Sequence, residues 1–338
     1  MANTTISELA TTVCNLPRCA IDASVWSWAN AYKVSITIFA LNQLGILRSL
    51  TREALTSSQL AVRFSVSEEL IVPLLDLLCS VQILQRNADQ FVASSSLEAV
   101  LPLVAMEAHV SATHLTAAQI VNVLQTGAPA DIFQKSDVQQ YVPVFTAAMR
   151  SSARTLAPHL VRFAGLTRCR KLLDLGGADG SLACAVQRMV PNLSITVIDL
   201  PRMAPAFAQN DGNQPESGIQ FHAGDLRDPE SLRDQFHDTD VIVLSNALHL
   251  LTTAHRSALF EVIRRSSPAA ARLLVYDQFI EEGPLDATHF MSVDWIVNGV
   301  AFRESADSYA ATLAGAGFVD VHTRRFSGLP GALLSARV

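Results

Sequence analysis

The chain has 338 residues, of which 49% are hydrophobic and 17% are charged, so it holds material for a large core and little that indicates disorder. Its net charge is −6, and its lysines and arginines are scattered rather than gathered into the basic stripe typical of nucleic-acid-binding proteins. The five cysteines include no C-x-x-C pair, which argues against a disulfide scaffold and against a cysteine zinc site. We therefore expect reduced thiols, no metal and no nucleic-acid partner.

The start of the chain predicts helices and no membrane anchor. Residues 1–25 lack a basic start followed by an apolar core, and Val34–Leu50 is too short and too polar to cross a bilayer. Residues 1–20 are polar, and apolar residues then recur at helical spacing from Ala23 to about Leu47. We expect a cytoplasmic protein without a membrane partner, and a homodimer in which this apolar face of the N-terminal domain meets a second copy.

A winged-helix pattern follows. Short helices are predicted over Gln59–Arg63 and Glu68–Val81, and a turn at 87–89 separates the strand-like runs Ile83–Leu84 and Phe91–Val92. Such a module binds DNA in some proteins and serves as an interaction module in others. Here the second helix is largely apolar and begins with two glutamates, which phosphates would repel, so the interaction module is favoured.

Residues 100–165 are predicted to be helical throughout. Phe145 and Met149 lie at helical spacing, so they are either core residues or part of a pocket wall. His109 and His114 are expected to be exposed or satisfied rather than ligands. The predicted division is a winged-helix dimerisation domain (1–100), a helical linker and pocket wall (101–165), and an α/β domain (166–338).

The last half of the chain alternates strands with amphipathic helices. The strands are predicted over 171–175, 194–199, 219–222, 240–246 and 272–277. The helices between them are predicted over 181–189, 203–208, 232–236 and 254–265. A helix over 305–316 and two strands over 318–325 and 332–338, able to pair antiparallel, complete the chain. The fold class is therefore α/β, with a mostly parallel sheet that would bind ligands at the carboxyl ends of its strands.

Polar residues stand where those strands end. Asp174 and the turn Gly176–Gly180 (G-G-A-D-G) follow the first strand, and Asp199 ends the second, where an acid can accept both hydroxyls of a ribose. The turn lacks the G-x-G-x-x-G pattern, which argues against a dinucleotide. Gly224-Asp225 follows the third strand, and Asp225 would suit either an adenine amino group or a turn.

These segments carry a family resemblance. L-D-L-G-G-A-D-G-S-L-A, V-I-D-L-P, H-A-G-D-L, N-A-L-H, L-L-V-Y-D and A-G-F together resemble the small-molecule O-methyltransferases of the caffeic-acid and hydroxyindole type, which include bacterial natural-product enzymes. The resemblance covers roughly residues 30–335. It implies a Rossmann-like class I methyltransferase domain, S-adenosylmethionine as cofactor, a winged-helix dimerisation domain, a pocket closed partly by the partner subunit, and a role in secondary metabolism.

The resemblance also implies site residues. His249, after the fourth strand, matches the family's catalytic base, and Asp277 stands where the family has a glutamate that orients this histidine. A phenol ionises only near pH 10, and an imidazole can remove its proton at neutral pH. The implied cofactor contacts are Asp174, Gly176, Gly177, Gly180, Asp199, Leu200, Gly224, Asp225, Leu226, Ser245 and Asn246. The implied substrate contacts are Phe145, Met149, Phe290, Met291, Asp294, Trp295 and Asn298, with Asp294 either a hydrogen-bonding residue of the pocket or a helix cap.

The sequence departs from the family at the base. Leu250 and Leu251 replace an aspartate and a tryptophan, and Ala178 replaces the middle glycine of the turn. The segment Ala301–Ser305 replaces G-R-E-R-T, so a second family glutamate falls on Glu304 or Arg303; His255 and His289 are weaker candidates for the base. The leading hypothesis is O-methylation of a small aromatic natural product. N- or C-methylation, and a non-methylating rearrangement or cyclisation on the same scaffold, are the alternatives.

Overall fold

The computed structural model describes residues 21–128, 138–210, 218–280, 287–298, 304–326, 329 and 331–338, and the structural statements below concern these residues. They divide into two compact units, one reaching Thr113 and the other beginning at His114. The helical segment predicted over 101–165 therefore runs across this division. The prediction for residues 1–20 lies outside the described residues. Within the described ranges, no helix combines the length and the apolar character that a bilayer crossing requires.

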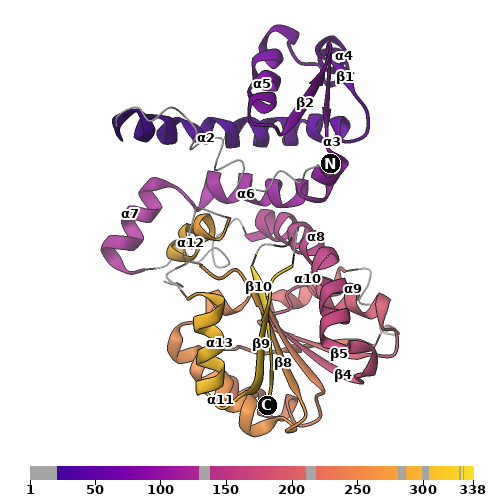
Figure 1. Cartoon of the computed structure of the whole chain (residues 1–338), viewed down its shortest axis with the longest axis vertical. Coiled ribbons are helices and arrows are strands. Elements are labelled where there is room, and N and C mark those ends of the chain that lie inside the picture. Colours follow the sequence, from indigo (N-terminus) through magenta and orange to yellow (C-terminus); the bar gives the residue numbers. More distant parts are fainter. Residues whose placement is uncertain are drawn as a thin grey trace. The chain divides into compact units, whose positions relative to one another are not determined.

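The first unit contains the helix, helix and β-ribbon order predicted from the sequence (Figure 1). Its elements are α2 (Ile21–Gln43), α3 (Ile46–Leu50), β1 (Leu55–Thr56), α4 (Ser57–Phe64), α5 (Glu68–Ser80), β2 (Leu84–Asn87), β3 (Gln90–Ala93), η1 (Ser95–Ala99) and α6 (Leu101–Thr113). Thr56 and Gln59 form a reciprocal capping box at the start of α4, and Ser67 caps α5. The strands form a small antiparallel sheet in the order β1-β3-β2.

Helix α2 leaves large apolar side chains in solvent. Trp26 is 72% exposed and Tyr32 is 56% exposed, and Val25, Trp28 and Ile36 are exposed with them. The spacing of Val25, Trp28, Tyr32 and Ile36 places these four along one side of the helix, and Trp26 lies beside them. Contiguous apolar side chains of this kind are typical of interaction surfaces. The predicted homodimer through this domain stays a prediction.

The second unit is a sheet covered by helices on both faces. Its helices are α7 (Ala117–Thr126), α8 (Val138–Ala164), η2 (Leu166–Arg168), α9 (Ser181–Met189), η3 (Pro201–Met203), α10 (Ala204–Ala208), η5 (Pro229–Gln235), η6 (Leu248–Leu250), α11 (Thr253–Ser266), α12 (Ala287–Val297) and α13 (Ala306–Gly315). Its strands are β4 (Lys171–Leu175), β5 (Ser194–Asp199), β6 (Ile219–Ala223), β7 (Val241–Ser245), β8 (Arg272–Asp277), β9 (Val319–Arg324) and β10 (Ala332–Arg337). In Figure 1, α11 and α13 lie on one side of these strands and α9 and α10 on the other.

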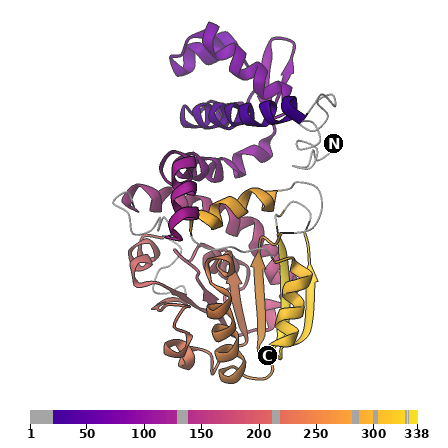
Figure 2. The ribbon, with the colours of Figure 1, turned by 90° about the vertical axis from the view of Figure 1, so that its left-hand side faces the viewer.

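The seven strands are ordered β6-β5-β4-β7-β8-β10-β9, with β4–β8 parallel and β9 and β10 antiparallel to their neighbours. The order reverses beside β4, and this is the crevice where open α/β sheets bind ligands. In Figure 2, turned by 90°, the gold helix α13 runs along the yellow strands β9 and β10.

Alternate residues of the central strands belong to two different cores. On β4, Leu173 and Leu175 pack with α11 and α13, whereas Leu172 packs with α8 and α9. β7 and β8 divide their side chains in the same way. Burial on both faces explains why these strands read as continuous apolar runs in the sequence. It also fixes the position of the polar residues that follow them, because every parallel strand ends at the same edge of the sheet.

His114 is buried, where the sequence left open whether this histidine is exposed or satisfied. It is 1% exposed and meets the ring of Tyr141 edge to face at 6.0 Å. It is therefore a buried residue of the second unit, located between α6 and α7.

Candidate active site

The glycine turn after β4 is shaped by close packing. The Gly176 amide donates to the Ile198 carbonyl at 2.8 Å, and a Cβ on Gly176 would lie only 2.8 Å from that of Ala247. A Cβ on Gly177 would lie 2.6 Å from Oδ2 of Asp174. Side chains at these two positions would displace the backbone, so the turn needs both glycines. Ala178, in place of the family's middle glycine, is held at a φ of 50°, in the left-handed region.

Asp174 lies beneath this turn. Its carboxyl group is 1% exposed and accepts no hydrogen bond from the described residues. Burial, followed by the negative charges of Asp199 and Asp179, raises the pKa of Asp174 to about 7. Asp174 therefore supports the turn by packing against Gly177, and its predicted contact with the cofactor stays a prediction.

Asp199, at the end of β5, holds the turn from the side. One carboxylate oxygen accepts from the Ala178 amide at 2.8 Å and the other from the Leu200 amide at 2.7 Å. Burial raises the pKa of Asp199, and these two hydrogen bonds act in the opposite direction. Each oxygen keeps a lone pair free for a hydroxyl donor. The bond to Ala178 also explains how a non-glycine residue holds its left-handed conformation there.

The loop after β6 places Gly224, Asp225 and Leu226 next to the turn, where the Leu226 side chain comes within 3.7 Å of a Cβ on Gly176. Asp225 is bound by its own loop: the Arg227 guanidinium donates to both carboxylate oxygens at 2.6–3.0 Å, and the Arg227 amide donates to one of them. The Arg227 side chain holds the pKa of Asp225 below its ordinary value. This pair was not predicted from the sequence, although an acid and an arginine two residues apart in a turn are its visible signal.

His249 and Asp277 form the central pair. His249 Nδ1 lies 2.7 Å from Asp277 Oδ1, and Asp277 is fully buried. The carboxylate also accepts from the backbone amides of Leu248, His249 and Gln278 at 3.0, 3.3 and 2.8 Å. An acceptor held in this way requires the imidazole proton on Nδ1, which leaves Nε2 with a lone pair. The pair therefore has the arrangement of an oriented general base.

The residues around this pair come from the ends of β7 and from α12. Ser245 is the last residue of β7, and Asn246 follows with a φ of 53° while its amide donates to the Tyr276 carbonyl at 2.8 Å. The buried Trp295 ring stacks on the His249 ring with centroids 5.2 Å apart. Asp294, beside it, is partly buried, and burial raises its pKa to about 6, with its own amide and the charge of His249 acting in the opposite direction.

The remaining predicted substrate residues lie in different surroundings. Met291 packs against the core that contains Trp295, and Asn298 donates to the Asp294 carbonyl at 3.0 Å. Phe290 is 52% exposed. Phe145 and Met149 are partly buried on α8, and the Phe145 ring lies 5.5 Å from that of Tyr141. Their part in a pocket stays a prediction.

The departures from the family pattern have structural consequences. Leu250 is 46% exposed, whereas Leu251 is buried in the core. Glu304, just before α13, accepts a hydrogen bond from the buried Arg256 of α11 at 2.8 Å. The two residues form an ion pair that links these helices. Arg303, the other candidate for the second family glutamate, lies outside the described residues.

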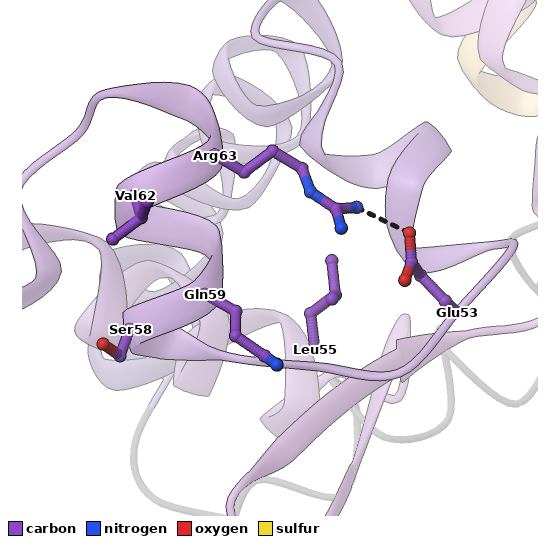
Figure 3. Close-up of a pocket in the computed structure, with 6 residues that line it drawn as sticks. All are labelled: Glu53, Leu55, Ser58, Gln59, Val62 and Arg63. Atoms are coloured by element: carbon purple, nitrogen blue, oxygen red, sulfur yellow. Dashed lines mark hydrogen bonds and ion pairs between the residues drawn. The ribbon is translucent and has the colours of Figure 1, made fainter.

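A separate hollow lies in the first unit, where Figure 3 shows Glu53, Leu55, Ser58, Gln59, Val62 and Arg63 around it. Arg63 closes one side by pairing with Glu53 at 2.6 Å. None of the predicted site residues lines it. Across the described ranges, no three His, Cys, Asp or Glu side chains converge as a metal site.

The sheet order, the glycine turn beside the switch point and the acid at the end of β5 define a Rossmann-like domain of the kind that binds nucleoside-containing ligands. A protein-family model described as "O-methyltransferase domain" matches residues 119–319, more than half of the chain. The chain belongs to this O-methyltransferase family.

Individual relatives agree with that assignment. The tetracenomycin polyketide synthesis 8-O-methyl transferase TcmO of Streptomyces glaucescens is 30% identical over 166 residues, 48% of each protein. The N,N-dimethyltransferase OxyT of Streptomyces rimosus is 23% identical over 93% of this chain and 96% of its own length. The chain matches about half the length of its first curated relatives.

Among solved structures, human N-acetylserotonin methyltransferase in complex with S-adenosylmethionine superposes with a TM-score of 0.75. The match covers 96% of this chain and 99% of that one at 20% identity. At this identity the likeness establishes the fold, which is the α/β fold predicted from the sequence.

Proposed function

We propose that the chain is an S-adenosylmethionine-dependent O-methyltransferase that acts on a hydroxyl group of a small aromatic natural product, with His249 as general base. The single observation that carries the proposal is the His249–Asp277 pair, with 2.7 Å between Nδ1 and Oδ1 and a fully buried carboxylate. Family membership supports the reaction class, and TcmO is one bacterial relative named for O-methylation in polyketide synthesis.

The residues at the sheet edge fit the cofactor. Asp199 would accept the ribose hydroxyls with the lone pairs left by its two backbone bonds, and the tight turn at Gly176 and Gly177 lets a ligand approach the backbone. Gly180, Leu200, Leu226, Ser245 and Asn246 flank this position in the sequence or the fold and are proposed to complete it. When bound, S-adenosylmethionine would supply a methyl group carried by a sulfonium.

The chain's own residues would handle the proton. Nε2 of His249 takes it from the acceptor hydroxyl, and Asp277 stabilises the resulting imidazolium through Nδ1–H. Trp295 limits the tilt of the ring by stacking on it. The cost of ionising a phenol at neutral pH is thereby reduced, and the remaining contribution is the positioning of two reactants.

The test is a screen of phenols with S-adenosylmethionine, read by the mass gain of one methyl group. His249→Ala should lower kcat by about 100-fold or more, the usual contribution of a general base. His237→Ala is the matched control, because this histidine is largely exposed beside Asp234 in the turn between η5 and β7 and its loss should leave kcat unchanged. Undiminished O-methylation by a folded His249→Ala protein would refute the base.

The second candidate is N-methylation, which the match to OxyT over nearly the whole chain favours. An amine with a free lone pair needs no base once it is positioned, so His249→Ala should then change kcat little. The third possibility is a non-methylating rearrangement or cyclisation. Reactions run without S-adenosylmethionine test it, because such an enzyme would still form product, with no gain of methyl mass. Size-exclusion chromatography with light scattering tests the proposed homodimer.

A further inference from the structure

Asp294 differs from the other acids near the proposed base. Asp199 is bound by two backbone amides, Asp225 by Arg227, Asp277 by His249, and Glu304 by Arg256. Among the described residues, no side chain or amide other than its own donates to the Asp294 carboxyl group. A partly buried carboxyl group whose only described donor is its own amide keeps acceptor positions that a ligand can satisfy.

Asp294 is also close to the chemistry. It immediately precedes Trp295, whose ring stacks on His249, and the charges of Asp294 and His249 interact. Met291 lies about one turn before it on α12, and Asn298, just after the end of that helix, donates its side-chain amide to the Asp294 carbonyl at 3.0 Å. Its partial exposure separates it from Asp174, which is buried against Gly177.

We infer that Asp294 accepts a hydrogen bond from a second polar group of the methyl acceptor, so that the site selects aromatic compounds with another hydroxyl or amino group near the hydroxyl that is methylated. The inference rests on the proposed function. An apolar substituent at that place would bury the carboxyl group further and leave its remaining acceptor positions unpaired, whereas an O–H or N–H group would satisfy one of them. The raised pKa of Asp294 reflects the same desolvation.

The experiment compares four small acceptors with S-adenosylmethionine: catechol and 2-aminophenol carry a second donor, and phenol and 2-methoxyphenol do not. For the wild-type protein, kcat/KM for catechol should exceed that for 2-methoxyphenol by about 10-fold or more, as expected for one buried hydrogen bond. Asp294→Leu should reduce this ratio to about threefold or less. Asp294→Asn, which keeps a carbonyl acceptor, should preserve most of it.

Two results would overturn the inference. One is an unchanged ratio in Asp294→Leu. The other is an equal loss of kcat for all four acceptors, which would mean that Asp294 acts through His249 rather than on the substrate. If the wild-type protein methylates none of the four, the proposed function loses support for these acceptors, and calorimetric titration in the presence of S-adenosylhomocysteine decides the inference. Tighter binding of catechol than of 2-methoxyphenol, abolished in Asp294→Leu, supports it; equal binding, or no binding of either, overturns it.

Discussion

Replacing Asp277 with asparagine tests the proposed base most directly, because the hydrogen bonds of this residue predict which way the new amide turns. Oδ1 accepts from His249 Nδ1 and the Gln278 amide, and Oδ2 accepts from the Leu248 and His249 amides. Asparagine converts one of these oxygens into an NH₂ group, which faces two donors in either orientation.

The two orientations are not equivalent. A backbone amide can only donate through its N–H, so an NH₂ group at the Oδ2 position would face two donors, the amides of Leu248 and His249, and both hydrogen bonds would be lost. At the Oδ1 position it would oppose only Gln278, because the imidazole can move its proton from Nδ1 to Nε2 and accept. The second orientation should therefore be favoured, and it removes the lone pair of Nε2 that the proposed mechanism uses.

The magnitudes follow from these bonds. Losing the Gln278 bond to a charged acceptor should destabilise the protein by about 1.5–3 kcal/mol. Losing the base should lower kcat by about 100-fold to 10,000-fold. The assay is the initial rate of methyl transfer to a phenol found in the screen, together with urea unfolding of the same preparation, so that a stability loss is not mistaken for a loss of the base.

Asp240→Asn is the matched control. Oδ2 of Asp240 also accepts from two backbone amides, those of Arg170 and Lys171, but at the opposite end of the parallel strands. An asparagine there can keep its carbonyl oxygen on both amides, so stability should fall only slightly and kcat should not change. If folded Asp277→Asn retains kcat within about threefold of the wild-type value, the orienting role of Asp277 is wrong.

Two further predictions concern the cofactor end of the site. Because burial raises the pKa of Asp174 to about 7 from 3.8, the folded protein holds this proton more tightly than the unfolded chain, and stability should fall as pH rises from about 4 through 7. In urea unfolding, the free energy of unfolding of Asp174→Asn should rise by about 2–3 kcal/mol relative to that of the wild type between pH 5 and pH 8, at about 1.4 kcal/mol per pKa unit. A difference between the two proteins that does not change with pH would contradict this account. If Asp225 accepts a donor of the cofactor, Asp225→Ala should weaken S-adenosylmethionine binding in calorimetry by about 10-fold, whereas Arg227→Ala, which removes an exposed ion pair but keeps the acceptor, should weaken it by less than about threefold. Equal losses in both variants would mean that the pair shapes the loop and that Asp225 does not bind the cofactor.

The strands were the most predictable part of the fold. β4, β5 and β8 begin and end where the sequence analysis placed them, because burial on both faces leaves an unbroken apolar run that polar residues end abruptly. The segment over 203–208 was less predictable: it starts as the 3₁₀ turn η3 and becomes helical only from Ala204. Pro201 and Pro205 fix backbone angles there without adding to the apolar period.

Partners of side chains were harder to predict than positions. The pairing of His249 with Asp277 was predictable because neighbouring parallel strands bring their ends together. The Arg227 clamp on Asp225 and the Arg256 pair with Glu304 depend on rotamers and on loop shape, which residue type does not determine. The sequence left open whether His114 is exposed or satisfied for the same reason, because its exposure depends on the helices that pack around it.

Three aspartates at one sheet edge show how depth and partners separate the roles of identical side chains. Asp174 is enclosed under the turn without a partner among the described residues, and its burial favours the protonated form. Asp199 is held by two amides at the rim, where its remaining lone pairs can meet a ligand. Asp277 is as buried as Asp174 but accepts four hydrogen bonds, which fix its orientation toward His249. The roles proposed for these residues, namely support of the turn, contact with the cofactor and orientation of the base, thus correspond to the number of donors that surround each carboxylate.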